Sequence, residues 1–325
     1  MSGRASPGVT AVSLNTALDR TLLVDELRPG AVHAAGREVL SAGGKAVNVV
    51  RALAALGVRA QVAGLAGGPT GRLVRRLARD DGIVARWFAT AGESRVCTVV
   101  VDAEARATVV NGRGPVVAPA EAAALGAYLD SRATRGDVVV LAGSAPPGVA
   151  DGVYAEWTRR ARERGAAAVV LDAHGALLVQ GLRARPDIVK VNVREFVLAA
   201  GREGPARAAR SLLAAGVVLG VVTLGPDGAL AFAPDQALYA RAPRIRAVNA
   251  TGCGDVFLAG LVAGRLRGCG LAEQLRLATA AAAANAARLE PGIGAPAAVA
   301  EGAAGVVVAA LTQDVEAAVW NRPLQ

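Results

Sequence analysis

Cysteine and histidine are scarce in this chain of 325 residues, which has three cysteines and two histidines. The cysteines are odd in number and lack metal-ligand spacing, so the sequence predicts neither a disulfide framework nor a zinc site. Two histidines are too few for a histidine metal cluster. The glycine-rich loops contain no Gly-x-Gly-x-x-Gly fingerprint, and no Gly-x-Ser-x-Gly elbow occurs. These absences disfavour zinc hydrolases, dinucleotide-dependent dehydrogenases and serine hydrolases.

Long apolar runs are also missing, because none reaches the roughly 18 residues that a membrane span needs. Residues 1–8 have no hydrophobic signal core, so we expect a cytoplasmic protein with no membrane partner. The net charge is +9, but the basic residues are scattered singly or in pairs, and aromatic residues make up only 3%. Without a basic tract or stacking residues, we expect no nucleic-acid partner.

Hydrophobic residues, by contrast, make up 53% of the chain and form short runs that alternate with helical segments. From residue 136 onward, strands are predicted at 137–142, 167–172, 187–191 and 217–224, with helices at 152–165, around 194–200 and at 205–215. Strands without polar alternation are typical of a parallel sheet that is covered on both faces. We therefore expect one large α/β domain over residues 1–325, with a minor appendage.

The N-terminal third has a different pattern. Short strands are predicted at 9–14, 21–27, 84–88, 95–102 and 107–110, and we expect them to build a small separate sheet. A buried helix is predicted at 44–56, apolar around most of its circumference with Arg51 as its only interior charge, and a charged surface helix at 71–81. The alanine run 280–284 indicates a packed helix.

Lysine occurs only twice among the 36 basic residues, at Lys45 and Lys190. Such a bias towards arginine indicates that both positions require lysine itself. Lysine presents a compact point charge, which suits a phosphate group.

The segment 249–255, Asn-Ala-Thr-Gly-Cys-Gly-Asp, precedes an apolar helix predicted at 256–266. Glycines allow a tight turn, and a helix start directs unpaired amide groups and a partial positive charge at whatever occupies that turn. We expect an anion site here, with Asp255 placed to take a proton from a nucleophile that attacks a bound phosphate. The alternative is that Asp255 only caps the helix.

Three further segments combine glycines or polar side chains with the predicted strands and helices. Segment 42–48, Ala-Gly-Gly-Lys-Ala-Val-Asn, is not a Walker A loop, but Lys45 and Asn48 share one helix face and can bind a polar ligand together. Segment 190–195 ends a strand, where Asn192 and Glu195 offer oxygens for magnesium or merely cap a helix. Segment 223–228 borders a nucleotide or forms a simple hairpin turn.

Taken in this order and spacing, these motifs resemble the PfkB family of carbohydrate kinases in the ribokinase superfamily, over nearly the whole chain. Segments 43–48 and 249–255 resemble the two family signatures. Segments 15–19, 92–95 and 143–148 look most like the branch of 1-phosphofructokinases and tagatose-6-phosphate kinases. The resemblance implies a ribokinase-like three-layer α/β/α domain with a mainly parallel central sheet. It also implies a small β-sheet lid, built from segments of about 12–40 and 84–114.

The resemblance also implies roles for individual residues. The substrate site would comprise Asp19, Gly43, Gly44, Lys45, Asn48, Arg95 and Ser144, with Lys45 and Arg95 on the phosphate that the sugar already carries. The ATP site would comprise Lys190, Asn192, Thr223, Gly225, Gly228, Thr251, Gly252 and Gly254. Asn192 and Glu195 would organise Mg²⁺, through water. Asp255 would be the catalytic base, and the backbone amides of Gly252, Cys253 and Gly254 would form the anion hole.

The predicted reaction is the ATP-dependent phosphorylation of a sugar phosphate, with fructose 1-phosphate as first choice and tagatose 6-phosphate or fructose 6-phosphate as alternatives. A homodimer through the lid is an expected partner arrangement. Two other functions stay open at this point: a ribokinase-like kinase of an unphosphorylated sugar or nucleoside, and a non-catalytic sugar-phosphate sensor. The sequence also leaves open any monovalent-cation requirement, any allosteric control and the reactivity of Cys253.

Overall fold

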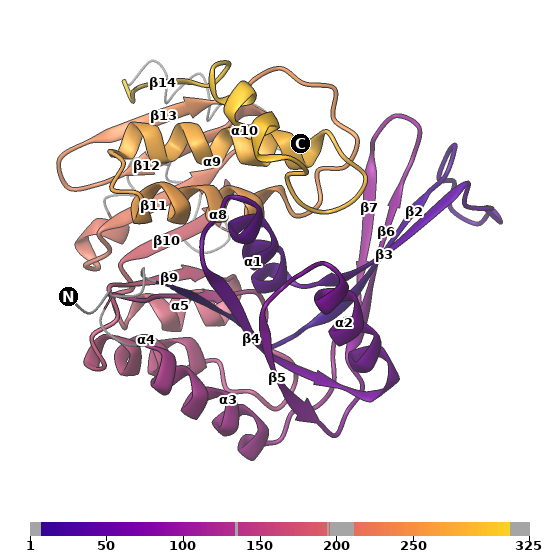
Figure 1. Cartoon of the computed structure of the whole chain (residues 1–325), viewed down its shortest axis with the longest axis horizontal. Coiled ribbons are helices and arrows are strands. Elements are labelled where there is room, and N and C mark those ends of the chain that lie inside the picture. The colour runs from indigo at the N-terminus through magenta and orange to yellow at the C-terminus, as the bar shows by residue number, and fades with distance from the viewer. Residues whose placement is uncertain (1–7, 134–135, 194, 196–210, 313–325) are drawn as a thin grey trace.

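The computed structural model describes residues 8–133, 136–193, 195 and 211–312, which form a ten-stranded sheet and a separate four-stranded sheet (Figure 1). The order in the large sheet is β14-β13-β12-β11-β10-β9-β8-β1-β4-β5. From β5 to β11 every neighbouring pair is parallel, and β12, β13 and β14 add antiparallel strands at the other edge. Its strands are β1 (Val9–Ser13), β4 (Ala60–Gly67), β5 (Ala85–Thr90), β8 (Val138–Ala142), β9 (Ala168–Asp172), β10 (Ile188–Asn192), β11 (Leu219–Thr223), β12 (Ala229–Phe232), β13 (Ala237–Arg241) and β14 (Val307–Ala310).

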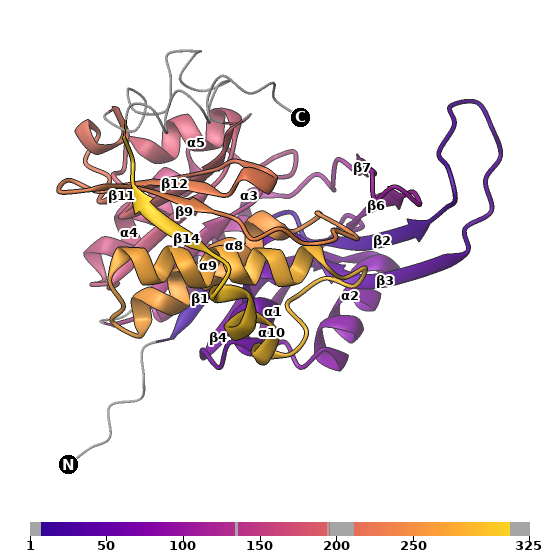
Figure 2. The same cartoon turned by 90° about the horizontal axis from the view of Figure 1, so that it is seen from above.

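Helices cover both faces of the large sheet, so the main body has three layers (Figure 2). One face carries α1 (Lys45–Ala55), α8 (Cys253–Leu266), α9 (Leu271–Ala286) and α10 (Pro296–Ala303); the other carries α3 (Pro119–Arg132), α4 (Val153–Glu163) and α5 (Gly175–Leu182). Strand β8 explains the arrangement, because Val138 and Val140 pack in the core of the first face, and Val139 and Leu141 in that of the second. Side chains alternate along a strand, so an uninterrupted apolar strand requires cover on both sides.

The small sheet has the order β3-β2-β6-β7 and extends from one end of the main body (Figures 1 and 2). Its strands are β2 (Ala17–Leu23), β3 (Arg37–Gly43), β6 (Arg95–Val101) and β7 (Ala107–Asn111), and helix α2 (Gly68–Asp80) packs beside it. Val99 and Val101 of β6 share a buried apolar cluster with Leu289, from the loop after α9. Arg37 also forms an ion pair with Glu290. The small sheet is therefore fastened to the main body by both apolar and charged contacts.

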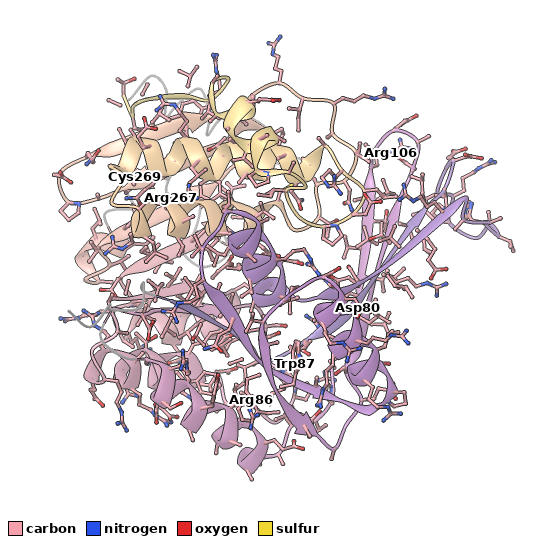
Figure 3. All side chains as sticks on the ribbon, in the orientation of Figure 1. Asp80, Arg86, Trp87, Arg106, Arg267 and Cys269 are labelled. Atoms are coloured by element: carbon pink, nitrogen blue, oxygen red, sulfur yellow. The ribbon has the colours of Figure 1, made fainter. Side chains whose placement is uncertain are left out.

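Two strand assignments made from the sequence are wrong, because segments 9–14 and 84–88 belong to the large sheet rather than the small one. Strand β1 pairs with β8 and β4, and β5 pairs in parallel with β4. Trp87 of β5 packs against the main core, with its ring over Gly64 of β4, while the neighbouring Arg86 is exposed (Figure 3). A short apolar strand fits either sheet by pattern alone, and only distant pairing decides its place.

The other element predictions are largely confirmed. Helices α1, α2 and α4 and strands β8, β9, β10 and β11 match their predicted segments to within three residues, and the alanine run lies in α9. Strand β2 begins and ends four residues earlier than its predicted segment, 21–27. Strands β3, β4, β12, β13 and β14 and helices α3, α5 and α10 were not predicted. The predicted helix around 194–200 and most of that at 205–215 lie outside the described residues. No helix in the described part of the chain combines the length and the apolar content that crossing a bilayer demands.

Candidate active site

Helices α1 and α8 pack against each other, and both begin at a glycine turn. Their N-cap residues, Gly44 and Gly252, have φ angles of 100° and 78°, which residues with a Cβ rarely adopt. Neither cap uses a side-chain hydrogen bond. The two turns are close, since a Cβ on Gly252 would lie 3.5 Å from the side-chain amide nitrogen of Asn48. Two helix N-termini with their partial positive charges therefore point into one region.

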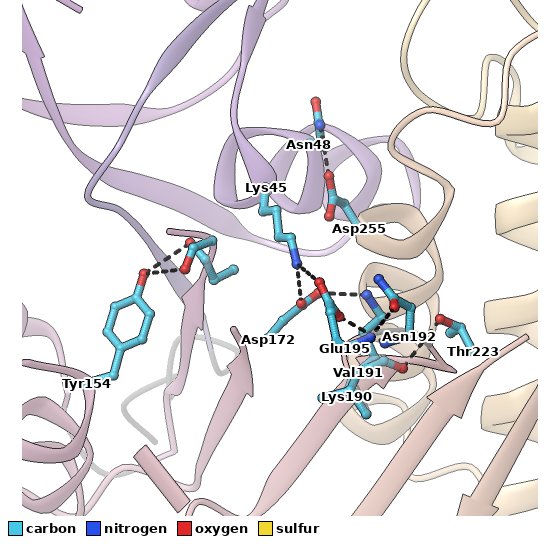
Figure 4. A network of polar contacts seen from close by, with 12 residues as sticks. Lys45, Asn48, Tyr154, Asp172, Lys190, Val191, Asn192, Glu195, Thr223 and Asp255 are labelled. Carbon is cyan, nitrogen blue, oxygen red and sulfur yellow. Dashed lines mark hydrogen bonds and ion pairs between the residues drawn. The ribbon is translucent and has the colours of Figure 1, made fainter. Parts of the chain in front are cut away.

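Asp255 lies in the first turn of α8 and is 6% exposed. Its Oδ2 accepts a hydrogen bond of 2.9 Å from Nδ2 of Asn48, in the first turn of α1 (Figure 4). Burial and, to a smaller extent, the nearby Asp172 raise the pKa of Asp255 to about 6, against the lowering effects of Lys45, Lys190 and the Asn48 amide. A carboxylate with a pKa near neutrality is well matched to accepting a proton at physiological pH.

Both lysines of the chain bind one buried carboxylate, Asp172, at the carboxyl end of β9 (Figure 4). Lys45 Nζ lies 2.7 Å from Oδ1, and Lys190 Nζ lies 2.9 Å from Oδ2. Burial alone would raise the pKa of Asp172, but Lys190 and Lys45 lower it below its ordinary value. Burial would lower the pKa of Lys45, but the carboxylates of Asp172, Glu195 and Asp255 raise it instead. Asp172 and Lys45 are therefore held in their charged forms inside the protein.

Asp172 was not among the predicted site residues. The available signal was the demand for lysine at two positions, which in turn implies an anion that both contact. Asp172 also ends a parallel strand, at the edge of the sheet where ligands collect. Ser144 and Asn192, which were predicted, follow or end the neighbouring strands β8 and β10.

Lys190 is 3% exposed and lies directly beneath the turn that begins α8. A Cβ on Gly254 would come within 2.8 Å of its Nζ, so glycine at that position leaves room for the amine. The lysine charge therefore adds to the positive field of the helix start. The prediction that Lys190 contacts a nucleotide stays a prediction, since its amine is directed at Asp172 and the turn.

Asn192 and Glu195 form a reciprocal cap. The Asn192 side-chain oxygen accepts from the Glu195 amide at 2.8 Å, and Glu195 Oε2 accepts from the Asn192 amide at 2.9 Å. The other carboxylate oxygen of Glu195 lies 3.5 Å from Lys45. Within the described residues no group of three histidine, cysteine, aspartate or glutamate side chains is arranged to hold a metal. A Mg²⁺ held through water is compatible with oxygens that are already occupied in the cap, and the predicted role of Asn192 and Glu195 in holding it stays a prediction.

Asp19, another of the predicted sugar residues, lies against the turn that begins α1. A Cβ on Gly43 would lie 2.0 Å from the Asp19 carboxyl carbon, so the carboxylate packs directly on the glycine backbone. Burial raises the pKa of Asp19 to about 6, against the lowering effect of Arg51 and Arg95. A small pocket opens beside it, lined by Asp19, Asn48, Thr251 and neighbouring residues.

Arg95 and Ser144 are linked through Asn15, which the site prediction omitted. Arg95 Nε donates to the Asn15 carbonyl at 3.0 Å, and its NH1 donates to the Gly112 carbonyl at 3.2 Å. The Asn15 amide donates to Ser144 Oγ at 3.1 Å. Arg95 is thus held by backbone carbonyls, whereas Lys45 is held by carboxylates. The two predicted phosphate ligands have different surroundings, and their shared role stays a prediction.

Thr223, Gly225 and Gly228 lie at a hairpin turn between β11 and β12, which was the simpler of the two sequence interpretations. Thr223 Oγ1 donates to the Val191 carbonyl at 3.4 Å. A Cβ on Gly228 would lie 1.9 Å from the Ala240 carbonyl oxygen, and its φ is 107°, so this turn requires glycine both for space and for its backbone conformation. Thr251 is held by its own amide, which donates to Asn249 Oδ1 at 2.9 Å. Contacts of these residues with ATP stay predictions.

The Cys253 thiol lies near Asn285, whose amide donates to the sulfur at 3.3 Å. Burial raises the pKa of this thiol to about 11. The thiol form therefore dominates at neutral pH, which favours a space-filling role for this side chain in the turn.

Comparison with known proteins agrees with this arrangement. Residues 11–298 match the model of the pfkB family of carbohydrate kinases. A 1-phosphofructokinase of Rhodobacter capsulatus is 37% identical over 84% of this chain and 88% of its own length. A 1-phosphofructokinase of Xanthomonas campestris pv. campestris is 35% identical over 92% and 98%. Among solved structures, a possible 1-phosphofructokinase of Thermotoga maritima has a TM-score of 0.86 at 25% identity, covering 94% of this chain and all of that one.

Proposed function

Because the chain belongs to the pfkB family of carbohydrate kinases, we propose that it phosphorylates a sugar phosphate with ATP, converting fructose 1-phosphate to fructose 1,6-bisphosphate. The observation that carries the proposal is Asp255, a buried carboxylate with a pKa near 6 at the start of a glycine-capped helix. A carboxylate so placed lies beside the amides that can stabilise a transferring phosphoryl group. Tagatose 6-phosphate and fructose 6-phosphate are the alternative acceptors.

In the proposed step, the free hydroxyl of the sugar phosphate attacks the γ-phosphorus of ATP. The hydroxyl proton passes to the Asp255 carboxylate, a new P–O bond forms, and ADP leaves with the electrons of the broken P–O bond. The amides of Gly252, Cys253 and Gly254 stabilise the charge on the transferring group, and Lys190 beneath the turn adds to their field. Bound Mg²⁺, held through water by Asn192 and Glu195, would neutralise charge on the nucleotide phosphates.

Substrate recognition is assigned to residues around the turn that begins α1 and to the start of β6. Asp19, Gly44 and Asn48 would hold sugar hydroxyls, and Lys45 and Arg95 would bind the phosphate already on the sugar, with Ser144 also in the substrate site. Arg95 supports an acceptor of this kind, since carbonyl contacts direct its guanidinium without neutralising its charge. An unphosphorylated acceptor would carry no anionic group for this guanidinium to bind.

An ADP-release assay with magnesium ATP tests the proposal across fructose 1-phosphate, fructose 6-phosphate, tagatose 6-phosphate, fructose and ribose. We expect selective turnover of fructose 1-phosphate, with a KM that rises in Arg95→Ala. Turnover of free sugars alone would indicate a ribokinase-like enzyme. Silence on every acceptor, with the protein folded and binding fructose 1-phosphate, would indicate a sensor.

The small sheet supports a homodimer as the assembly. Several apolar side chains on it are 39–64% exposed, namely Leu40, Val96, Val109 and Val110. Exposed apolar groups clustered on one sheet are typical of a protein contact. The molar mass of the purified protein, measured by light scattering, distinguishes this dimer from a monomer.

A further inference from the structure

Arg51 is a charged residue of α1 that the proposed mechanism does not use. Its side chain is 11% exposed, and its donors are distributed over three partners. Its Nη1 donates to Asn48 Oδ1 at 2.8 Å and its Nη2 donates to the Ala42 carbonyl at 2.6 Å. Nη2 and Nε also donate to Asp81 Oδ2, at 3.0 and 3.3 Å. One guanidinium thus joins the surface end of α2 to the first turn of α1.

The chemistry of the guanidinium fixes the orientation of Asn48. A guanidinium carries only donors, so the amide atom that faces it has to be the oxygen. The amide nitrogen of Asn48 then faces the other way, toward Asp255, and donates at 2.9 Å. A flipped amide would set its NH₂ group against the arginine and its oxygen against the carboxylate. Both contacts would be repulsive, so Arg51 selects one of the two amide orientations.

We propose that Arg51 is a positioning residue for phosphoryl transfer, which acts through Asn48 to keep a hydrogen-bond donor on the Asp255 carboxylate. The inference rests on the proposed function of Asp255 as the base. A donor to the ionised oxygen favours the form that can accept a proton from the sugar hydroxyl. It also fixes the direction of the carboxylate. The path runs from Arg51 to Asn48 to Asp255, over two hydrogen bonds.

Other charges also face Asp255 and have to be held constant in any test. They are Lys45 on α1, Asp172 at the end of β9 and Lys190 on β10. The charge of Arg51 additionally lowers the pKa of Asp19 on β2, so its removal has a second electrostatic route into the site. A test has to separate the route through Asn48 from these direct fields.

The first experiment compares kcat/KM for fructose 1-phosphate, with saturating magnesium ATP, between pH 5 and 8.5 in wild type, Arg51→Met and Arg51→Lys. Methionine retains bulk but donates no hydrogen bond. We expect the acid limb of the profile, where kcat/KM falls as the pH falls, to move to a pH about one unit higher. Lysine retains a charged donor, and we expect it to restore most of the wild-type limb. Substrate ionisation is common to all variants and cancels. An unmoved limb in Arg51→Met, or equal shifts in both variants, would overturn the proposal.

The second experiment is a double-mutant cycle with Asn48→Ala. If Arg51 acts through Asn48, adding Arg51→Met to Asn48→Ala leaves the acid limb where the single Asn48 variant places it. A further shift as large as that in the Asn48-containing protein would mean that Arg51 acts by its field on Asp19 or Asp255 directly, and would reject the proposed path.

Asp81→Asn is the matched control, because it weakens the outer contact of Arg51 and leaves the contact with Asn48. We expect its acid limb to coincide with that of wild type, whereas a shift equal to that of Arg51→Met would assign the effect to general loosening. If Arg51→Met does not fold, Arg51→Gln replaces it, because an amide can present either a donor or an acceptor and no longer selects one orientation of Asn48; its acid limb should also move to higher pH, and an unmoved limb would overturn the proposal. Failure of the base assignment is seen separately, as retained turnover in Asp255→Asn.

Discussion

Two buried aspartates face the same site, Asp172 at the end of β9 and Asp255 at the start of α8. Asp172 contacts two lysine amines directly, and its pKa is lowered. Asp255 accepts from a neutral amide and receives the lysine charges only from a distance, and its pKa is raised to about 6. Contact with a cation, rather than depth of burial, separates the two. The comparison teaches that one site holds a permanent structural charge and a titrating carboxylate side by side.

The two carboxylates also make opposite contributions to stability. The folded state binds a proton at Asp255 more readily than the unfolded state does, so ionised Asp255 costs stability above about pH 6, and that cost disappears as the pH falls towards 4. Asp172 stabilises the fold above its unfolded pKa near 4, and that contribution is lost as the pH falls through its lower folded pKa. Replacing each aspartate by asparagine therefore tests whether their contributions to stability have opposite signs.

The largest expected effect is on the activity of Asp255→Asn. Loss of the base should lower kcat by about 100- to 10,000-fold, while ATP binding is largely retained. The same variant should be more stable at pH 7.5, by up to about 3 kcal/mol, because a charge that burial disfavours has been removed. Steady-state kinetics and urea unfolding measure the two quantities. Asp80→Asn, at an exposed position, is the control and should change neither.

Asp172→Asn should have the opposite effect on stability. Two lysines would lose their shared carboxylate, and Lys190 would be left buried without a compensating charge. Breaking a buried pair in this way costs about 3–5 kcal/mol. Urea unfolding at pH 7.5, beside Asp255→Asn and Asp80→Asn, gives the result. If Asp172→Asn and Asp255→Asn changed the free energy of unfolding in the same direction, the contrast between the two carboxylates would be refuted.

The smallest of the three effects is the pH dependence of the wild type. Asp255 and Asp19 both have pKa values of about 6; Asp255 can take a proton only when it is ionised, and Asp19 accepts hydrogen bonds from sugar hydroxyls best when it is ionised. We expect kcat/KM to fall by at least about tenfold between pH 7.5 and 5, with a slope that exceeds one proton. Asp19→Asn should reduce that slope to one. A wild-type profile that is flat down to pH 5 would show that neither carboxylate titrates as the structure indicates.

The local features of the site could be predicted from the sequence. Gly44 and Gly252 were recognisable because a glycine turn before a helix is encoded within a few residues. The parallel βα units from β8 to β11 followed from apolar runs of the right length. Sequence spacing alone did not decide whether Asp255 is a cap or a base. The buried position and the partner on α1 now favour the base.

Contacts between distant segments could not be predicted from the sequence. Lys45 and Asp172 are 127 positions apart, so nothing local marks the aspartate as the partner that the lysine requires. Strand β5 was assigned to the wrong sheet for the same reason, because its apolar pattern does not record that β4 is its neighbour. Arg51 was recognised as an unusual interior charge, but its partners Asn48 and Asp81 become visible only when α1 and α2 are placed together.

The placement of both lysines has a consequence for amine-directed chemistry. Every other basic side chain is an arginine, so any acyl donor or amine-coupling reagent finds its side-chain targets only in this site. Lys190 is shielded by burial, and Lys45 is kept protonated by its carboxylate neighbours. Labelling of a side-chain amine would therefore report that the Asp172 cluster has opened. Amine reagents modify surface lysines on most proteins, but here they would report on the surroundings of the buried Asp172 carboxylate, which both lysines contact.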